Sequence, residues 1–344
     1  MKTKIITCAG YYGTGSSAIT DLLGEFDCVY YMGDFEFRFV QDPGGIADLD
    51  YNINENNHRH NSGHALKRFK KNIDFLAGNR YIKKYERFFD GRFKKISYEY
   101  IQKLTLFQYK GYWHQDVIDR GYWFYVLERV LEKSFNKFIV PIIYGGKKKD
   151  ALSIHLLRNE MTYVPIFDPD KFYELTKEYM NQLFSVANKQ QKEFIMVDQL
   201  VPPTNISRYS RYFESLKVVA VDRDPRDLYI LEKMVWHGGI VPTENVNDYC
   251  TWFENTRRHR AIEKDDKDVV LRVYLEDMVY HYEKTLNDIL KFLNIDNKSH
   301  FRPFTTFIPE QSKKNTRLWE KYPELDSDIK YIENKLSKFC YNNY

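Results

Sequence analysis

The chain begins with a glycine-rich loop whose residues are suited to binding an anion. The loop, Gly10-Tyr-Tyr-Gly-Thr-Gly15-Ser16-Ser17, follows the apolar run 4–9 and precedes apolar residues at helical spacing over 16–23. Glycines let successive backbone N–H groups turn toward one point, where the next helix also directs its first amides and positive dipole end. A strand, a loop and a helix in this order predict a phosphate-binding loop. Its contacts are expected from Tyr11, Tyr12, Gly13, Thr14, Gly15, Ser16 and Ser17.

The loop lacks one residue that phosphoryl-transfer enzymes use. Ser16 stands where a Walker A loop carries lysine. P-loop kinases and nucleoside triphosphatases hold the β- and γ-phosphates with that lysine. The loop therefore favours an anionic ligand other than a nucleoside triphosphate.

A second group of polar residues follows the apolar run 217–221. It reads Asp222-Arg223-Asp224-Pro225-Arg226-Asp227. Residues that directly follow a parallel strand lie at the carboxyl edge of the sheet, where α/β proteins bind ligands. Because a guanidinium group suits forked hydrogen bonding to phosphate, Arg223 and Arg226 are candidate phosphate ligands.

Four segments of the chain resemble those of sulfotransferases that use 3'-phosphoadenosine 5'-phosphosulfate (PAPS). They are the glycine loop, FIMVDQLVPPTNISRYSRYF at 194–213, the RDPRD turn after 222, and VLRVYLEDMVYHYEKTLNDILKFLNI at 270–295. Their order and spacing agree with that family, and the match covers roughly half the chain, mostly the nucleotide core. This resemblance implies that the chain is a bacterial carbohydrate sulfotransferase.

The resemblance implies PAPS as donor, adenosine 3',5'-bisphosphate as product and no metal requirement. It assigns the 3'-phosphate to the Arg223 turn, and it places a basic C-terminal loop near the donor, with Lys313 or Lys314 as contacts. Three positions depart from the family pattern. Gly13 lies near the place of a loop lysine, Leu231 stands where a serine is usual, and Gln199 stands where lysine is common.

Sulfuryl transfer needs an in-line acceptor and a base for its proton. In part of the family the base is a glutamate just after the second strand, and Glu36 holds that position here. His114 and His237 are alternative bases, since each follows a tryptophan that could flank a sugar. The alternative roles are an ion pair with Arg38 for Glu36 and ordinary packing for the histidines. By family analogy the acceptor is a saccharide that offers a hydroxyl or an amine.

The elements expected to position these residues form an α/β fold. Apolar runs predict strands at 4–9, 28–32, 138–144, 194–197, 217–221 and 269–273. Helices between them imply a doubly wound, mostly parallel sheet of P-loop NTPase type. Residues 55–135 have helical stretches at 65–75 and 98–108 and are interpreted as a helical insertion that forms part of the acceptor site. The whole chain, 1–344, is expected to be one sulfotransferase-like domain.

Composition limits the other function classes. The 344 residues carry 52 Lys and Arg against 48 Asp and Glu, a net charge of +4, which is too small for a typical nucleic-acid partner. The four cysteines show no metal-ligand spacing, and His58, His60 and His64 lie in a polar stretch, so no metal site is predicted. No apolar run is long enough to span a bilayer and no signal-peptide pattern is present, so a cytoplasmic location is expected. The oligomeric state is left open.

Two other functions remain possible from the sequence. A P-loop small-molecule kinase could use Asp198 and Asp222, each after an apolar strand, to hold Mg²⁺ beside ATP. A non-catalytic relative could keep nucleotide binding without turnover, which would account for the missing loop lysine.

Overall fold

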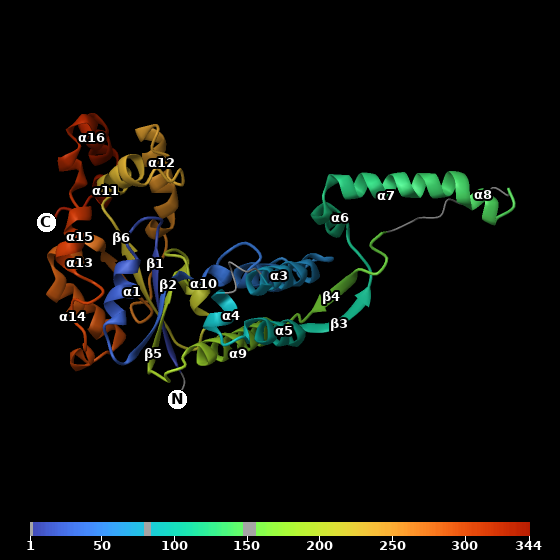
Figure 1. Ribbon diagram of the computed structural model, residues 1–344, viewed down its shortest axis with the longest axis horizontal. Helices are drawn as coiled ribbons and strands as arrows, with labels where there is room; N and C mark the ends of the chain where they lie inside the picture. Colours follow the sequence, from blue (N-terminus) through green and yellow to red (C-terminus); the bar gives the residue numbers. More distant parts are fainter. Residues whose placement is uncertain (1–2, 79–83, 147–155) are drawn as a thin grey trace. The chain divides into compact units, whose positions relative to one another are not determined.

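The structure of the chain is a computed structural model that describes residues 3–78, 84–146 and 156–344. It divides into two compact units (Figure 1). The first comprises Met1–Asp42, Glu86–Arg92 and Thr176–Tyr344, and the second comprises Pro43–Tyr85 and Phe93–Leu175.

A five-stranded parallel sheet forms the centre of the first unit. Its strands lie in the order β2-β5-β1-β6-β7, and every neighbouring pair is parallel. Numbered along the chain within this sheet, the order is 2-3-1-4-5, with the first strand in the middle. The connections leave β1 in opposite directions, which creates a topological switch point at its carboxyl end. The predicted doubly wound sheet is confirmed. The strands are β1 (Lys4–Gly10), β2 (Val29–Glu36), β5 (Phe194–Asp198), β6 (Leu216–Asp222) and β7 (Val270–Tyr274).

The core of this unit explains why these strands are apolar along their length. Ile6, Met196 and Val219 lie on one face of the sheet and pack with Ile19 and Ile289 from two helices, α1 and α14. Since helices cover a parallel sheet, its central strands are buried and read as continuous hydrophobic runs. The helices of this unit are α1 (Ser17–Gly24), α10 (Ile206–Ser210), α11 (Pro225–Ile230), α12 (Val246–Arg257), α13 (Leu275–Tyr280), α14 (Tyr282–Leu293), α15 (Pro309–Ser312) and α16 (Asp326–Lys335).

The second unit combines helices with an antiparallel strand pair. The two strands, β3 (Thr105–Lys110) and β4 (Met161–Pro165), pair with each other as a separate two-stranded sheet. The helices are α2 (Ile46–Asp50), α3 (Asn61–Gly78), α5 (Phe93–Lys103), α6 (His114–Arg120), α7 (Tyr122–Ser134) and α8 (Val140–Ile143). Two further helices, α4 (Lys84–Phe88) and α9 (Pro169–Ala187), each contain residues of both units.

Two predictions for this unit are wrong. The apolar run 138–144 is not a strand, because it continues the helix of α7 through a π-helical turn, Phe135–Ile139, into α8. A short apolar run does not distinguish strand from helix, and Pro141 is tolerated because it lies in the first turn of α8. The helix predicted over 98–108 ends at Lys103, and the residues after it form β3. The unit is also wider than the insertion predicted over 55–135.

Among the described residues, none of the helices is both long and apolar enough to cross a membrane.

Candidate functional site

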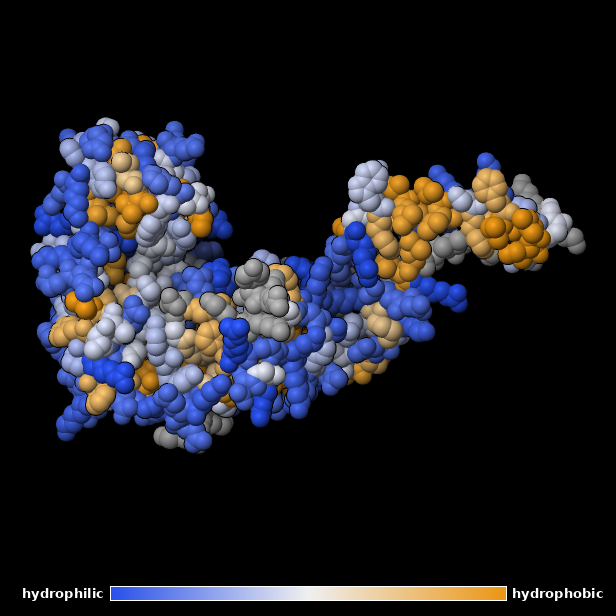
Figure 2. Space-filling view, viewed as in Figure 1, coloured by the Kyte–Doolittle hydropathy of each residue, from blue (hydrophilic) through white to orange (hydrophobic). Residues whose placement is uncertain are grey.

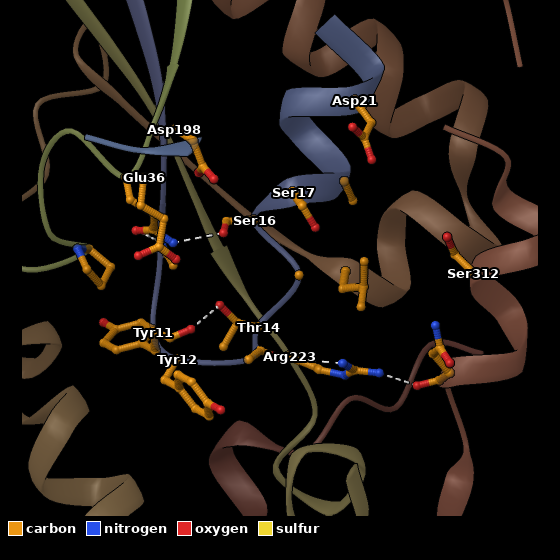
Figure 3. Close-up of a pocket in the computed structure, with 18 of the residues that line it drawn as sticks. Tyr11, Tyr12, Thr14, Ser16, Ser17, Asp21, Glu36, Asp198, Arg223 and Ser312 are labelled. Carbon is orange, nitrogen blue, oxygen red and sulfur yellow. Dashed lines mark hydrogen bonds between the residues drawn. The ribbon is translucent and has the colours of Figure 1, made fainter. Parts of the chain in front are cut away.

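A cavity of about 980 Å³ opens at the carboxyl end of β1 in the first unit (Figure 3). The loop residues Tyr11, Tyr12, Gly13, Thr14, Gly15, Ser16 and Ser17 all line it, together with Glu36 and Arg223. The C-terminal segment contributes Gln311, Ser312 and Asn315. The structure thus brings together nine of the residues that the sequence proposed for the site.

Several backbone amides of the glycine loop, whose residues line the cavity, have no acceptor among the described residues. The hydroxyl of Thr14 donates to the carbonyl oxygen of Tyr11 at 2.7 Å, and the Thr14 amide donates to the same oxygen at 3.1 Å. In the described part of the chain, no acceptor pairs with the backbone amides of Gly13, Gly15, Ser16 and Ser17. Amides grouped at the start of a helix form an anion-binding concavity. The loop therefore presents four donors for one negatively charged group.

Gln199 fixes the shape of the loop from the neighbouring strand β5. Its side-chain oxygen accepts from the Gly10 amide at 3.2 Å, and its side-chain nitrogen donates to the Ser16 hydroxyl at 2.8 Å. Its own backbone is left-handed, with φ of 49°, and its carbonyl oxygen accepts from Gln41. Gln199, which stands where the sulfotransferase pattern commonly has lysine, therefore binds both ends of the loop through an uncharged side chain.

Arg223 is the buried cation of the cavity. Only 3% of the residue is exposed, and its guanidinium group donates to the carbonyl oxygens of Gly13, at 3.3 Å, and of Asn315. Its Nε atom is buried and has no hydrogen-bond partner. A buried donor without an acceptor costs free energy, so an acceptor from a ligand would stabilise it. This group is suited to an anion that lies between the loop and the C-terminal segment.

Three carboxyl groups surround Arg223 on the side of the protein core. Asp224, Asp227 and Glu276 are fully buried. Burial, followed by the charge of Asp227, raises the pKa of Glu276 to about 8. Burial also raises the pKa of Asp227. Burial lowers the pKa of Arg223, and the neighbouring carboxylates oppose that change. Because arginine stays charged in proteins, Arg223 supplies a permanent positive charge to the cavity.

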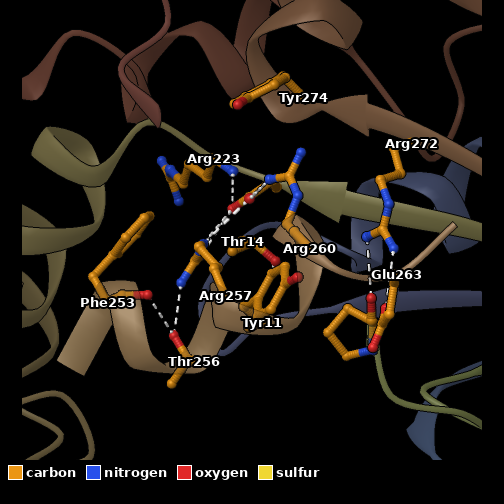
Figure 4. Close-up of polar contacts among 12 residues, drawn as sticks. Tyr11, Thr14, Arg223, Phe253, Thr256, Arg257, Arg260, Glu263, Arg272 and Tyr274 are labelled. Carbon is orange, nitrogen blue, oxygen red and sulfur yellow. Dashed lines mark hydrogen bonds and ion pairs between the residues drawn. The ribbon is translucent and has the colours of Figure 1, made fainter. Parts of the chain in front are cut away.

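Asp222, at the end of β6, forms ion pairs with Arg257 and Arg260. Figure 4 shows these two arginines. The Asp222 carboxylate accepts from Arg257 Nη2 at 2.8 Å and from Arg260 Nη1 at 2.7 Å. The Arg257 guanidinium lies between the rings of Tyr11, at 4.1 Å, and Phe253, at 3.4 Å from each centroid. Asp222 therefore positions Tyr11 in the loop through Arg257. This arrangement disfavours Asp222 as a metal ligand, and no cluster of metal-binding side chains occurs among the described residues.

Asp198, the other carboxylate of the kinase alternative, lines the cavity but is nearly buried. The thiol of Cys8 donates to its Oδ1 atom at 2.7 Å. Burial and the nearby Asp198 charge raise the pKa of Cys8, so the thiol stays protonated and remains a donor to this carboxylate.

Glu36 lies at the edge of the same cavity. Its carboxylate is 53% exposed and approaches Arg38 at 3.6 Å. The cavity is also lined by Gln41, Pro203 and Thr204. Tyr12, Trp236 and Trp252 also line the cavity, and the Tyr12 and Trp236 rings meet edge to face with centroids 6.2 Å apart. A cavity lined by aromatic rings and a carboxylate suits a ligand with apolar faces and hydroxyl groups.

Five other predicted site residues do not line this cavity. Arg226 is turned inward, where it pairs with Asp224 at 2.6 Å and with Glu333 at 2.7 Å. Lys313 lies over the Tyr280 ring at 5.8 Å, and the Lys314 carbonyl oxygen accepts from Lys321. The remaining two are His237, an exposed residue that follows a π-helical turn, and His114, which begins α6 in the second unit.

Sequence reasoning missed several residues that shape the site. Arg257 and Arg260 lie in the basic run Arg257-Arg258-His259-Arg260, which begins at the last residue of α12 and was a detectable signal in the sequence. Asn315 belongs to the C-terminal polar stretch that was singled out for its lysines. The contact with Arg223 is made by the Asn315 carbonyl oxygen, and a backbone contact leaves no signal in side-chain types.

Comparison with known proteins gives distant structural likenesses only. No protein-family model and no curated protein sequence matches the chain. The sulfotransferase domain of the Synechococcus PCC 7002 olefin synthase is 11% identical, with a TM-score of 0.40 over 92% of this chain and 89% of that one. A retinol dehydratase solved with androsterone and the inactive cofactor PAP is 12% identical, with a TM-score of 0.36 over 99% and 82%. Sulfotransferase STF1 from Mycobacterium tuberculosis is 11% identical, with a TM-score of 0.34 over 92% and 77%. Likenesses this distant do not identify the activity of the chain.

Proposed function

We propose that the chain is a sulfotransferase that uses PAPS as its donor. The observation that carries this proposal is the convergence of the loop amides and the buried Arg223 in one cavity, with the Arg223 Nε atom lacking an acceptor. The amides of Gly13 to Ser17 and the guanidinium group suit a ligand with two separate anionic groups, as PAPS has. No cationic side chain of the loop faces them, so the loop favours a group with less charge than a triphosphate.

In the proposed reaction each group has a defined task. PAPS supplies the sulfuryl group when it is bound. The loop amides would hold the 5'-phosphate and stabilise the negative charge that develops on it, and Arg223 would hold the 3'-phosphate. Glu36 would accept the proton of the attacking hydroxyl or amine. We propose that no metal ion is required.

A saccharide is the proposed acceptor. The cavity is lined by the aromatic residues Tyr12, Trp236 and Trp252, and also by Ile240 and Thr256. Flat aromatic rings stack on the apolar faces of sugars, and nearby polar groups fix the orientation of a bound ligand. The proposed contributions of His237, Lys313 and Lys314 would require movement of exposed segments toward the ligand.

Calorimetric titration with adenosine 3',5'-bisphosphate tests the donor site. The wild-type chain should bind the bisphosphate in the presence of EDTA, and Arg223→Ala should weaken binding by at least about tenfold, since a hydrogen bond to a charged group contributes roughly 1.5–3 kcal/mol. Arg258→Ala removes the same charge from an exposed position outside the cavity and is the matched control. Ser17→Ala provides a second test at an exposed cavity residue, where a folding defect is not expected.

The same titration separates the alternatives. Binding of ATP with Mg²⁺ in place of the bisphosphate would favour the kinase. Bisphosphate binding without release of bisphosphate from PAPS in the presence of any sugar or amino-sugar would favour a non-catalytic relative.

A further inference from the structure

The second unit carries a continuous helix whose apolar face is covered by no other described residue of that unit. We call residues 122–143 the helical arm. They comprise α7, the π-helical turn Phe135–Ile139 and α8, about 33 Å in length at 1.5 Å per residue. Figure 2 shows hydrophobic side chains gathered along α7 and α8. An uncovered apolar surface of this size marks an interaction site.

Six of the exposed apolar residues of the helical arm form one face. Trp123, Leu127, Val130 and Leu131 on α7 are followed by Phe138 and Ile142, at spacings of three, four or seven residues. Trp123 is 80% exposed and Ile142 is 77% exposed. The face is therefore apolar along the whole arm.

One edge of this face is basic. Arg129, Lys133 and Lys137 recur every four residues and so form a row along the helix. No carboxylate of the described residues pairs with Lys133 or Lys137. The carboxylates of the arm are otherwise engaged: Glu128 is buried and accepts from the Leu156 amide at 3.0 Å, and Glu132 pairs with Arg129 at 2.8 Å. The charged side chains beside the apolar face that have no carboxylate partner among the described residues are therefore those of Lys133 and Lys137, which are positive.

We propose that the helical arm binds an anionic lipid membrane surface, with its apolar face between the headgroups and the acyl chains. A helix with aromatic and aliphatic side chains on one face and Lys or Arg beside them is suited to the membrane interface. Trp123 and Tyr122 at its start favour the headgroup region, where amphipathic rings gather. Its charged residues and their spacing do not suit a span across the bilayer.

A second copy of the chain is the less favoured occupant. Helices that pack through an apolar face are stabilised by opposite charges along its edges. In a symmetric pair of helical arms, the same lysine row would flank both partners, and like charges would oppose each other. An anionic lipid surface has the opposite charge to the lysine row. For this reason we favour a membrane over a second copy of the chain.

Flotation of the full chain with lipid vesicles tests the proposal. Wild type should float with vesicles that contain about one third phosphatidylglycerol and much less with pure phosphatidylcholine vesicles. Ile142→Glu should reduce the bound fraction by at least about tenfold, because it removes buried apolar area and adds a negative charge. Ile262→Glu makes the same change at a residue of equal exposure, 77%, in the first unit and should leave binding unchanged.

A charge series gives an independent readout. The double variant Lys133→Gln with Lys137→Gln should lose about fivefold in affinity for the anionic vesicles per charge removed. The control removes two exposed lysines of the first unit, Lys264 and Lys267, in the same way and should have no effect. Leu127→Glu replaces Ile142→Glu if that variant does not fold.

Three results would overturn the proposal. The first is no flotation of the wild-type chain with anionic vesicles. The second is an equal loss of binding in Ile142→Glu and Ile262→Glu. The third is a wild-type dimer in sedimentation that Ile142→Glu converts to a monomer, without vesicle binding by either, which would assign the helical arm to self-association.

Discussion

Two arginines of one motif have opposite surroundings in the structure. Arg223 lines the cavity with its Nε atom unpaired, whereas Arg226 is turned toward Asp224, Glu333 and the Trp319 ring. Arg226 stacks on that ring at 3.9 Å and follows the helix cap formed by Asp224. At the residue scale, the two arginines of the RDPRD turn therefore have different roles. Arg223 places a positive charge at the cavity, whereas Arg226 binds residues of the C-terminal segment.

Glu36→Gln tests the proposed base. The change keeps the shape of the side chain and removes its ability to accept a proton. We expect the rate of transfer from PAPS to fall by about 10²–10⁴, whereas affinity for adenosine 3',5'-bisphosphate should change by less than about twofold. The rate is measured as bisphosphate release on whichever sugar or amino-sugar of a panel the wild type accepts.

The alternative bases serve as comparisons for this variant. His237→Gln and His114→Gln should each retain a rate within about threefold of wild type if Glu36 is the base. A full rate in Glu36→Gln together with a large loss in either histidine variant would reassign the base.

At the element scale, the glycine loop depends on neighbours from three separate segments. Leu275, at the start of α13, packs against Gly15, while Leu228 of α11 and Trp236 pack against Gly13. Gln199 at the end of β5 ties the two ends of the loop together. The loop therefore takes its shape from the parallel sheet, which brings the ends of β1, β5 and β6 to one edge.

Gly15→Ala tests this packing. Gly15 has φ of +82°, and an added Cβ atom would lie 2.9 Å from Leu275 Cδ2. We expect a loss of about 2–5 kcal/mol in the free energy of unfolding, from left-handed strain plus overpacking, and a loss of bisphosphate binding. Denaturant unfolding and calorimetry measure the two effects.

Gly33→Ala is the matched control for that variant. Gly33 has a similar φ of +85°, but an added Cβ atom there meets nothing within 4 Å. Only the backbone strain remains, about 1–2 kcal/mol, and nucleotide binding should be kept. Equal stability losses in the two variants would contradict the packing of the loop against Leu275.

At the scale of the whole molecule, distant segments meet behind the cavity. The side chain of Asp227 accepts from the backbone amides of Arg317 and Leu318, and Glu276 accepts from the Asp224 amide. The buried carboxyl groups thus connect the end of β6, the start of α13 and the C-terminal segment that lines the cavity. Their protonation is coupled to folding because the unfolded chain exposes them to water.

The stability of the protein should fall as the pH rises between about 5 and 8. Burial raises the pKa of Glu276 from its ordinary value near 4.5 to about 8, so between these values the folded state binds more protons than the unfolded state. The free energy of unfolding therefore decreases with pH across this window. The glutamine of the Glu276→Gln variant cannot ionise, so the free energy of unfolding should decrease less with pH in this variant. Part of the decrease should remain because the pKa of Asp227 is raised as well. Denaturant titrations at several pH values measure this.

A matched variant makes the pH test specific. Glu283→Gln alters an exposed carboxylate on α14 and should leave the pH profile of wild type unchanged. If the free energy of unfolding of Glu276→Gln changed with pH as it does in wild type, the raised pKa of Glu276 would be contradicted.

Much of the first unit could be predicted from local patterns. The strand at 194–197 and the strand at 217–221 are continuous apolar runs followed by polar residues, and the structure has β5 and β6 there. The second unit was predicted less well. Residues 138–144 and 105–108 were assigned to the wrong element type, because short apolar or mixed runs satisfy both periods and the outcome depends on the neighbours with which they pack.

The sequence by itself determined the glycine loop between a strand and a helix, the parallel sheet and the place of Arg223 at the cavity. Strand, turn and helix signals are local, and parallel strands align their carboxyl ends. Tertiary structure alone decided which charges face the cavity. Arg226 and Arg223 are three residues apart and equally basic, yet only the packing of Glu333 and Trp319 from distant segments turns Arg226 inward. Likewise, no local signal shows that the Asn315 carbonyl oxygen meets Arg223, or that the described residues of the second unit leave the apolar face of the helical arm uncovered.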